Sequence, residues 1–264
     1  MATADGDRKS WQKMTEEEKR LRDIAAEEMR TYPQERVISF YHEGKKYWIK
    51  KKQGNGRNRW VKASESHQFY YEAAHMMMAA RLVPYVPDMV FLTDACMVLR
   101  DAGYTAAEWL RGGAGDGEKR HILYEAGAAL ARLHKAGLFH GRPALRDMTW
   151  NGKNIVFLDW ENRPFFKDLQ SRQCMDVILF FQGMYRESWM QERWTESALA
   201  GYAAAGGDEM LQKVCAFLQR YAWIGWLCAA LHPFHFKDVE ALSTVYQWLP
   251  ARQMAIFSAS TGQE

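Results

Sequence analysis

The order of strand and helix patterns along the chain most constrains what it can fold into. Residues 36–52 and 89–99 have the composition of strands joined by turns, and one helical segment, 64–81, lies between them. From residue 101 onward, apolar residues recur mainly at helical spacing. The sequence therefore predicts a two-lobed α+β fold, in which a small antiparallel sheet with one helix precedes a larger, mainly helical lobe.

The same patterns define three expected regions. Residues 1–35 form an N-terminal helical extension, because Thr15–Glu18 (TEEE) is a capping box and Pro33 ends the amphipathic pattern that follows it. Residues 36–100 form the N-terminal lobe, and residues 101–264 form the C-terminal lobe. We expect the first helix to pack against the following lobe rather than to lie on a membrane surface.

Composition excludes several classes of protein. With 48% hydrophobic and 25% charged residues, the 264-residue chain is globular rather than disordered. The four cysteines lie far apart without a C-x-x-C pair, which excludes a disulfide-dense scaffold and a zinc ribbon. A net charge of +3 is too small to argue for nucleic acid, and the basic stretch at residues 50–59 is the only support for a nucleic-acid binder.

The apolar segments of the chain are short. The charged N-terminus lacks the apolar core of a secretory signal. The longest strongly apolar stretch, Tyr221–Leu231, has 11 residues, whereas a helical membrane span needs about 20. We therefore expect a cytoplasmic protein whose Trp223 and Trp226 belong to the core, and four free thiols suit such a reducing compartment.

The segment Leu133–Glu161, LHKAGLFHGRPALRDMTWNGKNIVFLDWE, carries the chemistry. It opens with L-H-x-x-G-x-x-H-G, which ends at Gly141, and closes with a hydrophobic strand followed by Asp159-Trp160-Glu161. This combination resembles the catalytic core of the protein-kinase-like superfamily. The resemblance is greatest to its small bacterial branches, the aminoglycoside and choline-type phosphotransferases and the lipopolysaccharide core (Kdo and heptose) kinases. In those families a catalytic Asp follows H-G, an Asn lies five residues after that Asp, and a hydrophobic strand then ends in D-x-E or D-F-G.

The chain departs from this pattern at the catalytic position. Arg142 follows His140-Gly141 and lies 17 residues before Asp159, and Asp147 lies 12 residues before it. This spacing places Arg142 where the family has its catalytic Asp, and Asp147 where the family has its Asn. A guanidinium stays protonated and cannot accept the proton of a substrate hydroxyl. It can instead bind a substrate phosphate or carboxylate, or pair with Asp147 or Asp159.

The resemblance implies ATP and Mg²⁺ as cofactors and assigns roles to four residues of this segment. Asp147 and Asp159 are the metal ligands, because magnesium prefers carboxylate oxygens. His140 and Arg142, with the same two aspartates, make up the expected catalytic set. Farther along the chain, Asp176 resembles the buried Asp that supports the catalytic loop, although a helix cap is an equal interpretation.

The front half carries the expected nucleotide site. Tyr47–Lys50 resembles the strand that ends in the phosphate-binding lysine, and Glu72 on the next helix is its expected partner. On a strand, Lys50 and Lys52 share one face and Lys51 points the other way, so the register stays open among the three.

The expected adenine contacts lie on a later strand. Leu99 and Arg100 resemble the strand and hinge that hold adenine through backbone hydrogen bonds. The later basic residues Arg186, Arg193, Lys213 and Arg220 could meet an acidic or lipid-bearing substrate, but a solvated face is the simpler interpretation.

Two functions follow from the resemblance. The first is an ATP-dependent kinase that transfers a γ-phosphoryl group to a hydroxyl of a small molecule, a sugar or a lipid-linked acceptor, such as a cell-envelope core sugar. Peripheral contact with the inner face of the inner membrane fits such an acceptor. The second is a pseudokinase, which binds nucleotide or a partner without phosphoryl transfer, and Arg142 is the main reason to consider it.

Overall fold

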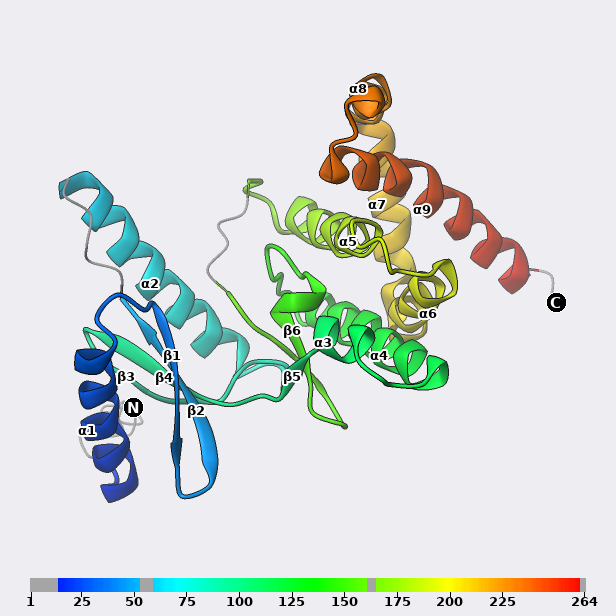
Figure 1. Cartoon of the computed structure of the whole chain (residues 1–264). Helices are drawn as coiled ribbons and strands as arrows, with labels where there is room; N and C mark the ends of the chain where they lie inside the picture. The colour runs from blue at the N-terminus through cyan, green and yellow to red at the C-terminus, as the bar shows by residue number, and fades with distance from the viewer. Residues whose placement is uncertain (1–13, 53–58, 161–164, 262–264) are drawn as a thin grey trace, which may run out of the picture. The chain divides into compact units, whose positions relative to one another are not determined.

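A computed structural model of the chain describes residues 14–52, 59–160 and 165–261 (Figure 1). The chain divides into two compact units. The first unit comprises Met1–Ala73 and Pro87–Asp101, and the second comprises Ala74–Val86 and Ala102–Glu264. Each unit has its own secondary structure and core, and each is described in turn.

The first unit is built on a four-stranded antiparallel sheet with the strand order β1-β2-β4-β3. Its elements in chain order are α1 (Glu16–Thr31), β1 (Val37–His42), β2 (Lys45–Lys51), α2 (Arg59–Ala79), β3 (Met89–Leu92) and β4 (Cys96–Arg100). Helix α2 begins five residues earlier than the pattern predicts, because no helix-breaking residue separates Arg59 from residue 64. Its last turns belong to the second unit.

Local chemistry explains how this sheet begins. The β1–β2 turn needs two residues with positive φ, and Glu43 (φ 48°) and Gly44 (φ 74°) supply them. The predicted capping box is present, since the Thr15 and Glu18 side chains each bond the backbone amide of the other residue.

Helix α1 packs on the first sheet, as expected. Leu21 and Ala25 of the helix share one buried cluster with strand residues that include Ile38, Tyr47 and Ile49. Burial of this apolar face explains why the helix belongs to the same compact unit as the sheet that follows it.

The second unit is mainly helical and contains a small three-stranded sheet, ordered β5-β6-β7. Its elements are β5 (Tyr104–Thr105), α3 (Ala106–Arg111), α4 (Asp116–Lys135), η1 (Leu145–Asp147), β6 (Met148–Trp150), β7 (Ile155–Phe157), α5 (Leu169–Tyr185), α6 (Glu192–Tyr202), η2 (Ala203–Gly207), α7 (Asp208–Arg220), α8 (Ala222–Leu231), η3 (His232–Phe234) and α9 (Lys237–Thr261). The predicted α+β class, with a small antiparallel sheet followed by a larger helical part, is therefore confirmed.

Helix α8 corrects the expectation that its tryptophans are core residues. Trp223 is 61% exposed and Trp226 is 79% exposed. The helix packs on α9 through Gly225, where a Cβ would lie 2.8 Å from the Tyr246 ring, and it buries Cys228 on the same face. The two indole rings consequently lie on the opposite side, in solvent.

Within the described part of the chain, no single helix is both long and apolar enough to cross a bilayer. Glu192–Arg220 and Ala222–Phe234 meet the length and composition criteria only when combined, across a bend of 65°.

Close packing of α4 and α6 yields the first testable prediction. A Cβ at Gly127 would lie 1.9 Å from the Ala198 carbonyl oxygen, and one at Gly201 would lie 1.9 Å from that of Tyr124. Gly127→Ala and Gly201→Ala should therefore push the helices apart and cost about 1–3 kcal/mol of unfolding free energy, measured by chemical denaturation. Gly117→Ala is the control, since it lies in α4 with open space around it. Equal stability of all three variants would refute the close approach.

Candidate functional site

A β-hairpin in the second unit brings the two predicted metal ligands to one end. Strands β6 and β7 pair antiparallel with Met148 opposite Phe157, and the Leu158 amide donates to the Asp147 carbonyl at 2.7 Å. Asp147 comes immediately before the first strand, and Asp159 comes two residues after the second. The hairpin thus converts a separation of 12 residues in sequence into proximity in space.

Aromatic packing fixes the segment around Asp159. Trp160 is fully buried, and its indole nitrogen donates to the Phe157 carbonyl at 2.7 Å. The ring of His140 packs against both Phe157 and Trp160. Between these anchors Asp159 adopts a left-handed conformation with φ 56°, which Asp tolerates better than most residues. Glu161, the last residue of the D-W-E motif, lies outside the described residues.

His140 is a buried part of the loop before the hairpin. Its side chain nitrogen Nε2 lies 2.5 Å from the Leu158 carbonyl, so this nitrogen carries the proton and donates. The bond ties the loop that contains Arg142 to the strand end that precedes Asp159. His140 therefore orients the loop that contains Arg142 relative to the strand end before Asp159.

Asp176 of helix α5 anchors the same loop. It is fully buried, and its two carboxylate oxygens accept the backbone amides of His140 at 2.5 Å and Gly141 at 2.7 Å. His134 Nε2 lies 3.3 Å from one of these oxygens. The residue lies in the middle of its helix and supports the loop backbone, so the helix-cap interpretation is wrong.

Asp147 is also a buried carboxylate, but its surroundings differ from those of Asp176. Burial raises its pKa, and the nearby charge of Asp159 raises it further. Arg146 and Arg142 oppose that shift, from 3.7 Å and 3.9 Å, distances too long for strong hydrogen bonds. Among the residues that the structure describes, the Oδ2 atom of Asp147 is buried without any hydrogen-bond partner.

A divalent cation fits this arrangement. Two neighbouring carboxylates repel each other, and the unpartnered buried oxygen of Asp147 is a ready ligand. No group of three or more His, Cys, Asp or Glu side chains that could hold a metal occurs in the described part of the chain. A pair of carboxylates is a set that Mg²⁺ accepts, because it usually takes one or two carboxylates and completes its shell with water and phosphate oxygens.

The predicted lysine–glutamate pair is present in the first unit. Lys50 Nζ of β2 lies 2.6 Å from Glu72 Oε1 of α2, and the two residues are only 7% and 2% exposed. Lys51 points the other way and donates to the Tyr32 carbonyl, and Lys52 donates to the Tyr70 hydroxyl. Of the three lysines, Lys50 is therefore the one that pairs with Glu72, and its role in nucleotide binding stays a prediction.

The expected adenine contacts, Leu99 and Arg100, lie within the sheet of the first unit. Leu99 pairs with Trp48 on one side and Met89 on the other. The Arg100 amide donates to the Asp88 carbonyl at 2.9 Å, and its guanidinium pairs with the Asp88 carboxylate. Arg100 therefore has no amide donor left for a base, and its role in adenine binding stays a prediction.

No sequence motif predicts several cationic side chains that lie beside Arg142. Arg111, Arg146, Arg186 and Lys237 line a cavity that Arg142 also lines. They come from four separate parts of the second unit, so no spacing rule links them in the sequence. Basic and acidic residues are balanced in the C-terminal half, so composition gives no sign of this cluster either.

Comparison with known proteins supports the kinase-like assignment in part. The chain is 29% identical to an uncharacterized protein of Haemophilus influenzae over 216 residues, which cover 81% of this chain and 89% of that protein. It is also 29% identical, over 92 residues, to a probable serine/threonine-protein kinase BUD32 homolog of Archaeoglobus fulgidus. This second match covers 34% of the chain and 46% of the kinase homolog. No family model matches the chain. The partial similarity and the layout of a small sheet with a helical part fit a kinase-like fold.

The second prediction concerns the buried charge of Asp147. Because its pKa is raised in the fold, the ionised form carries a stability cost at neutral pH that disappears as acid protonates it. Asp147→Asn should therefore raise the thermal midpoint by a few degrees at about pH 8 in EDTA, where about 1 kcal/mol corresponds to about 2–4 °C. The gain should shrink at about pH 5. Differential scanning fluorimetry measures both.

The exposed Asp23→Asn is the control for that measurement. A lower midpoint for Asp147→Asn at both pH values would mean that hydrogen bonds satisfy the Asp147 carboxylate.

Proposed function

We propose that this protein is an ATP-dependent, kinase-like phosphotransferase that acts on a hydroxyl group. The observation that carries the proposal is the unsatisfied buried carboxylate of Asp147 beside Asp159, at the hairpin end where the resemblance expects metal ligands. The buried Lys50–Glu72 pair supports it independently, because it is the pair that the resemblance expects to hold nucleotide phosphates.

Each residue has a defined task in this proposal. Lys50 contacts the nucleotide phosphates, and Glu72 pairs with its ammonium group and orients it. Asp147 and Asp159 hold Mg²⁺, which supplies neutralisation of phosphate charge when bound. The acceptor oxygen forms a bond to the γ-phosphorus, the bond to the β–γ bridging oxygen breaks, ADP leaves, and the hydroxyl proton passes to solvent.

Arg142 favours a second candidate, a pseudokinase. Its guanidinium takes the place of the carboxylate that accepts the hydroxyl proton, and it cannot accept one. A loose transition state for phosphoryl transfer depends mainly on positioning and charge neutralisation, so the missing base lowers the rate rather than abolishing the reaction. We therefore rank transfer first and nucleotide binding without transfer second.

The acceptor that we propose is a sugar hydroxyl of the cell-envelope core, free or lipid-linked. The resemblance to lipopolysaccharide core kinases supports this class. We place the protein in the cytoplasm, in peripheral contact with the inner face of the membrane, and with no nucleic acid among its partners. The exposed apolar side chains around α8 support the membrane contact.

The membrane-contact surface consists of Trp223, Trp226, Leu227, Phe234 and Phe236, all of which are exposed. Helix α8 contains no charged residue. Arg220 precedes it, and Lys237 follows the two phenylalanines. Exposed aromatic rings flanked by cations suit the interface of an anionic bilayer, where the rings sit at the level of the headgroups.

The third prediction tests nucleotide binding. Calorimetry of Mg–ATP binding should show a loss of about tenfold or more for Asp159→Asn and for Lys50→Met, because each removes a charge that faces the nucleotide or its metal. Lys51→Met is the matched control, since Lys51 bonds the end of α1 and points away. Asp159→Asn should weaken metal-free ATP binding much less.

One result would contradict that prediction, and another would favour the second candidate function. Equal Mg–ATP affinity in wild type and Asp159→Asn would remove Asp159 from the site. Mg–ATP binding without phosphate release or transfer, in the presence of candidate sugars, would favour the pseudokinase.

The fourth prediction tests the membrane-contact surface. Co-sedimentation with vesicles of phosphatidylcholine and phosphatidylglycerol should fall at least about fivefold for Trp223→Ser/Trp226→Ser, because the rings supply most of the buried apolar area. Met254→Ser is the control, since Met254 is equally exposed but lies on α9, away from this surface. Unchanged sedimentation of the double variant would refute the membrane contact.

A further inference from the structure

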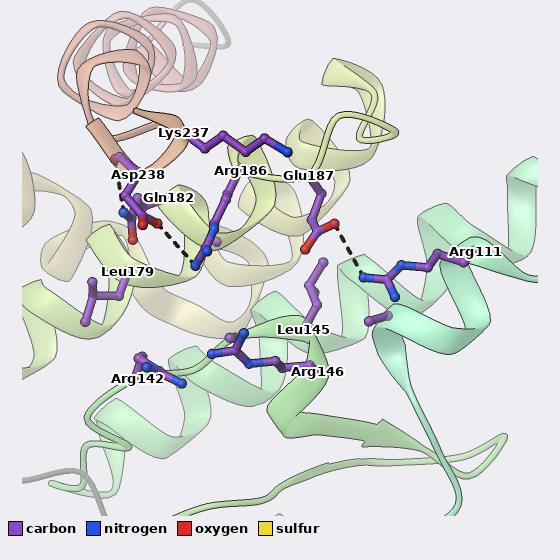
Figure 2. Close-up of a pocket in the computed structure, with 13 residues that line it drawn as sticks. Arg111, Arg142, Leu145, Arg146, Leu179, Gln182, Arg186, Glu187, Lys237 and Asp238 are labelled. Atoms are coloured by element: carbon purple, nitrogen blue, oxygen red, sulfur yellow. Dashed lines mark hydrogen bonds and ion pairs between the residues drawn. The ribbon is translucent and has the colours of Figure 1, made fainter. Parts of the chain in front are cut away.

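A cavity of about 490 Å³ in the second unit is lined in part by Leu145 and Arg146, the two residues that precede Asp147. Its walls come from helix α3, the loop and turn that contain Arg142 and Arg146, the end of α5 and the start of α9 (Figure 2). This volume is in the range of small-molecule sites. The nature of its walls decides which kind of molecule fits.

Positive charge dominates these walls. Five cationic side chains line the cavity, Arg111, Arg142, Arg146, Arg186 and Lys237, against two carboxylates, Glu187 and Asp238.

The two acidic residues each engage one arginine. Arg111 lies 3.4 Å from Glu187, and Arg186 lies 3.2 Å from Asp238. These pairs account for both carboxylates of the lining and for two of its five cations. Three cations of the lining are left without an acidic partner among the lining residues.

Those three cations, Arg142, Arg146 and Lys237, make only weak ion pairs or none elsewhere in the described part of the chain. Arg142 and Arg146 share Asp147, at 3.9 Å and 3.7 Å, and neither distance is that of a strong charge-assisted hydrogen bond. Lys237 makes no ion pair within the described part of the chain. Donors that are grouped in a concave site and weakly engaged are available to an anion.

The side chains are also arranged to converge. Figure 2 shows the guanidinium of Arg186 reaching down from α5 toward that of Arg146, with Arg142 beside it. Planar guanidinium groups bind phosphate oxygens in pairs of parallel hydrogen bonds, and several of them suit a dianionic group better than a single carboxylate.

We propose that this cavity binds the phosphate group of a phosphorylated, hydroxyl-bearing molecule such as a sugar phosphate. The phosphate contacts Arg142 and Arg146, Arg186 contacts it while keeping its pair with Asp238, and Lys237 adds long-range attraction. Because Arg142 and Arg146 also flank Asp147, a molecule held in this way lies beside the proposed metal site. That molecule is then the phosphoryl acceptor, an assignment that rests on the proposed function, whereas anion binding does not.

The test uses the full chain without nucleotide, in EDTA. Calorimetry compares glucose 6-phosphate, inorganic phosphate and glucose. We expect both phosphates to bind and glucose not to bind, and Arg186→Gln/Lys237→Gln should weaken phosphate binding by about tenfold or more. Arg193→Gln/Lys213→Gln is the matched control, because it removes the same charge from exposed cations outside the cavity and should change affinity less than about twofold.

A second arm distinguishes a free phosphate from a lipid headgroup. Vesicles that contain phosphatidic acid replace the sugar phosphate, in a background that carries Trp223→Ser/Trp226→Ser. Binding that is lost in Arg186→Gln/Lys237→Gln identifies the lipid headgroup as a source of the same chemistry. Binding of glucose 6-phosphate alone identifies a soluble one.

The outcomes separate this inference from the proposed function. If no phosphate probe binds better than glucose, or if the control variant loses as much affinity, the anion site is refuted even where Mg–ATP binds normally. If glucose 6-phosphate binds as expected but Mg–ATP does not bind, the anion site stands and its assignment as the acceptor site is refuted. Mg–ATP affinity that is retained in Arg186→Gln/Lys237→Gln supports two separate sites.

Discussion

The hydrogen bonds between Asp176 and the backbone of His140 and Gly141 hold the centre of the second unit in place. A fully buried carboxylate is tolerated in a protein interior only when donors surround it, and two backbone amides and His134 meet that need here. The constraint fixes where the loop begins and hence where Arg142 emerges. It also fixes His140, whose ring reaches the strand end before Asp159.

Asp147 is the physical opposite of Asp176, although both are buried aspartates. One oxygen of Asp147 has no hydrogen-bond partner in the described structure, and the charge of Asp159 adds repulsion. Folding alone gives no reason to leave a charged oxygen unsatisfied, because a neutral side chain would remove the cost. The contrast separates an aspartate whose charge the fold satisfies from one whose charge the fold leaves uncompensated.

The sequence predicted those features that depend on local pattern. Chain order predicted the fold class, and motif spacing singled out Asp147 and Asp159. Strand alternation predicted that Lys50 and Lys51 face opposite ways, but the choice among the three lysines stayed open until the structure paired Lys50 with Glu72. Prediction from the sequence failed where long-range packing determines which side chains are buried. Trp223 and Trp226 lie in an apolar stretch, yet Gly225 and Cys228 form the buried face of α8 and turn both rings outward.

The sequence pattern could not predict the basic cavity either, because long-range packing decides which residues line it. Arg111, Arg142, Arg186 and Lys237 are spread over more than 100 residues of sequence, and only the folded chain brings them to one cavity. A basic residue on a helix is by default a solvated one, so sequence alone favoured a solvated face for Arg186. Tertiary structure changes that assignment because it adds concavity and several neighbours of the same charge.

Three electrostatic costs to the stability of this fold bear on whether the protein has only a structural role. A buried pair such as Lys50–Glu72 seldom stabilises a protein more than apolar side chains of the same volume would, because both charges lose their hydration. Asp147 adds a second uncompensated cost, and the like-charged cavity walls add a third. Each of these costs falls when an oppositely charged ligand binds: phosphates at Lys50, a cation at Asp147 and an anion in the cavity. A chain that needed only its shape would be more stable without all three, so the charges favour ligand binding over a purely structural role. Arg142 then bears on a narrower question, namely the rate of phosphoryl transfer in the proposed reaction.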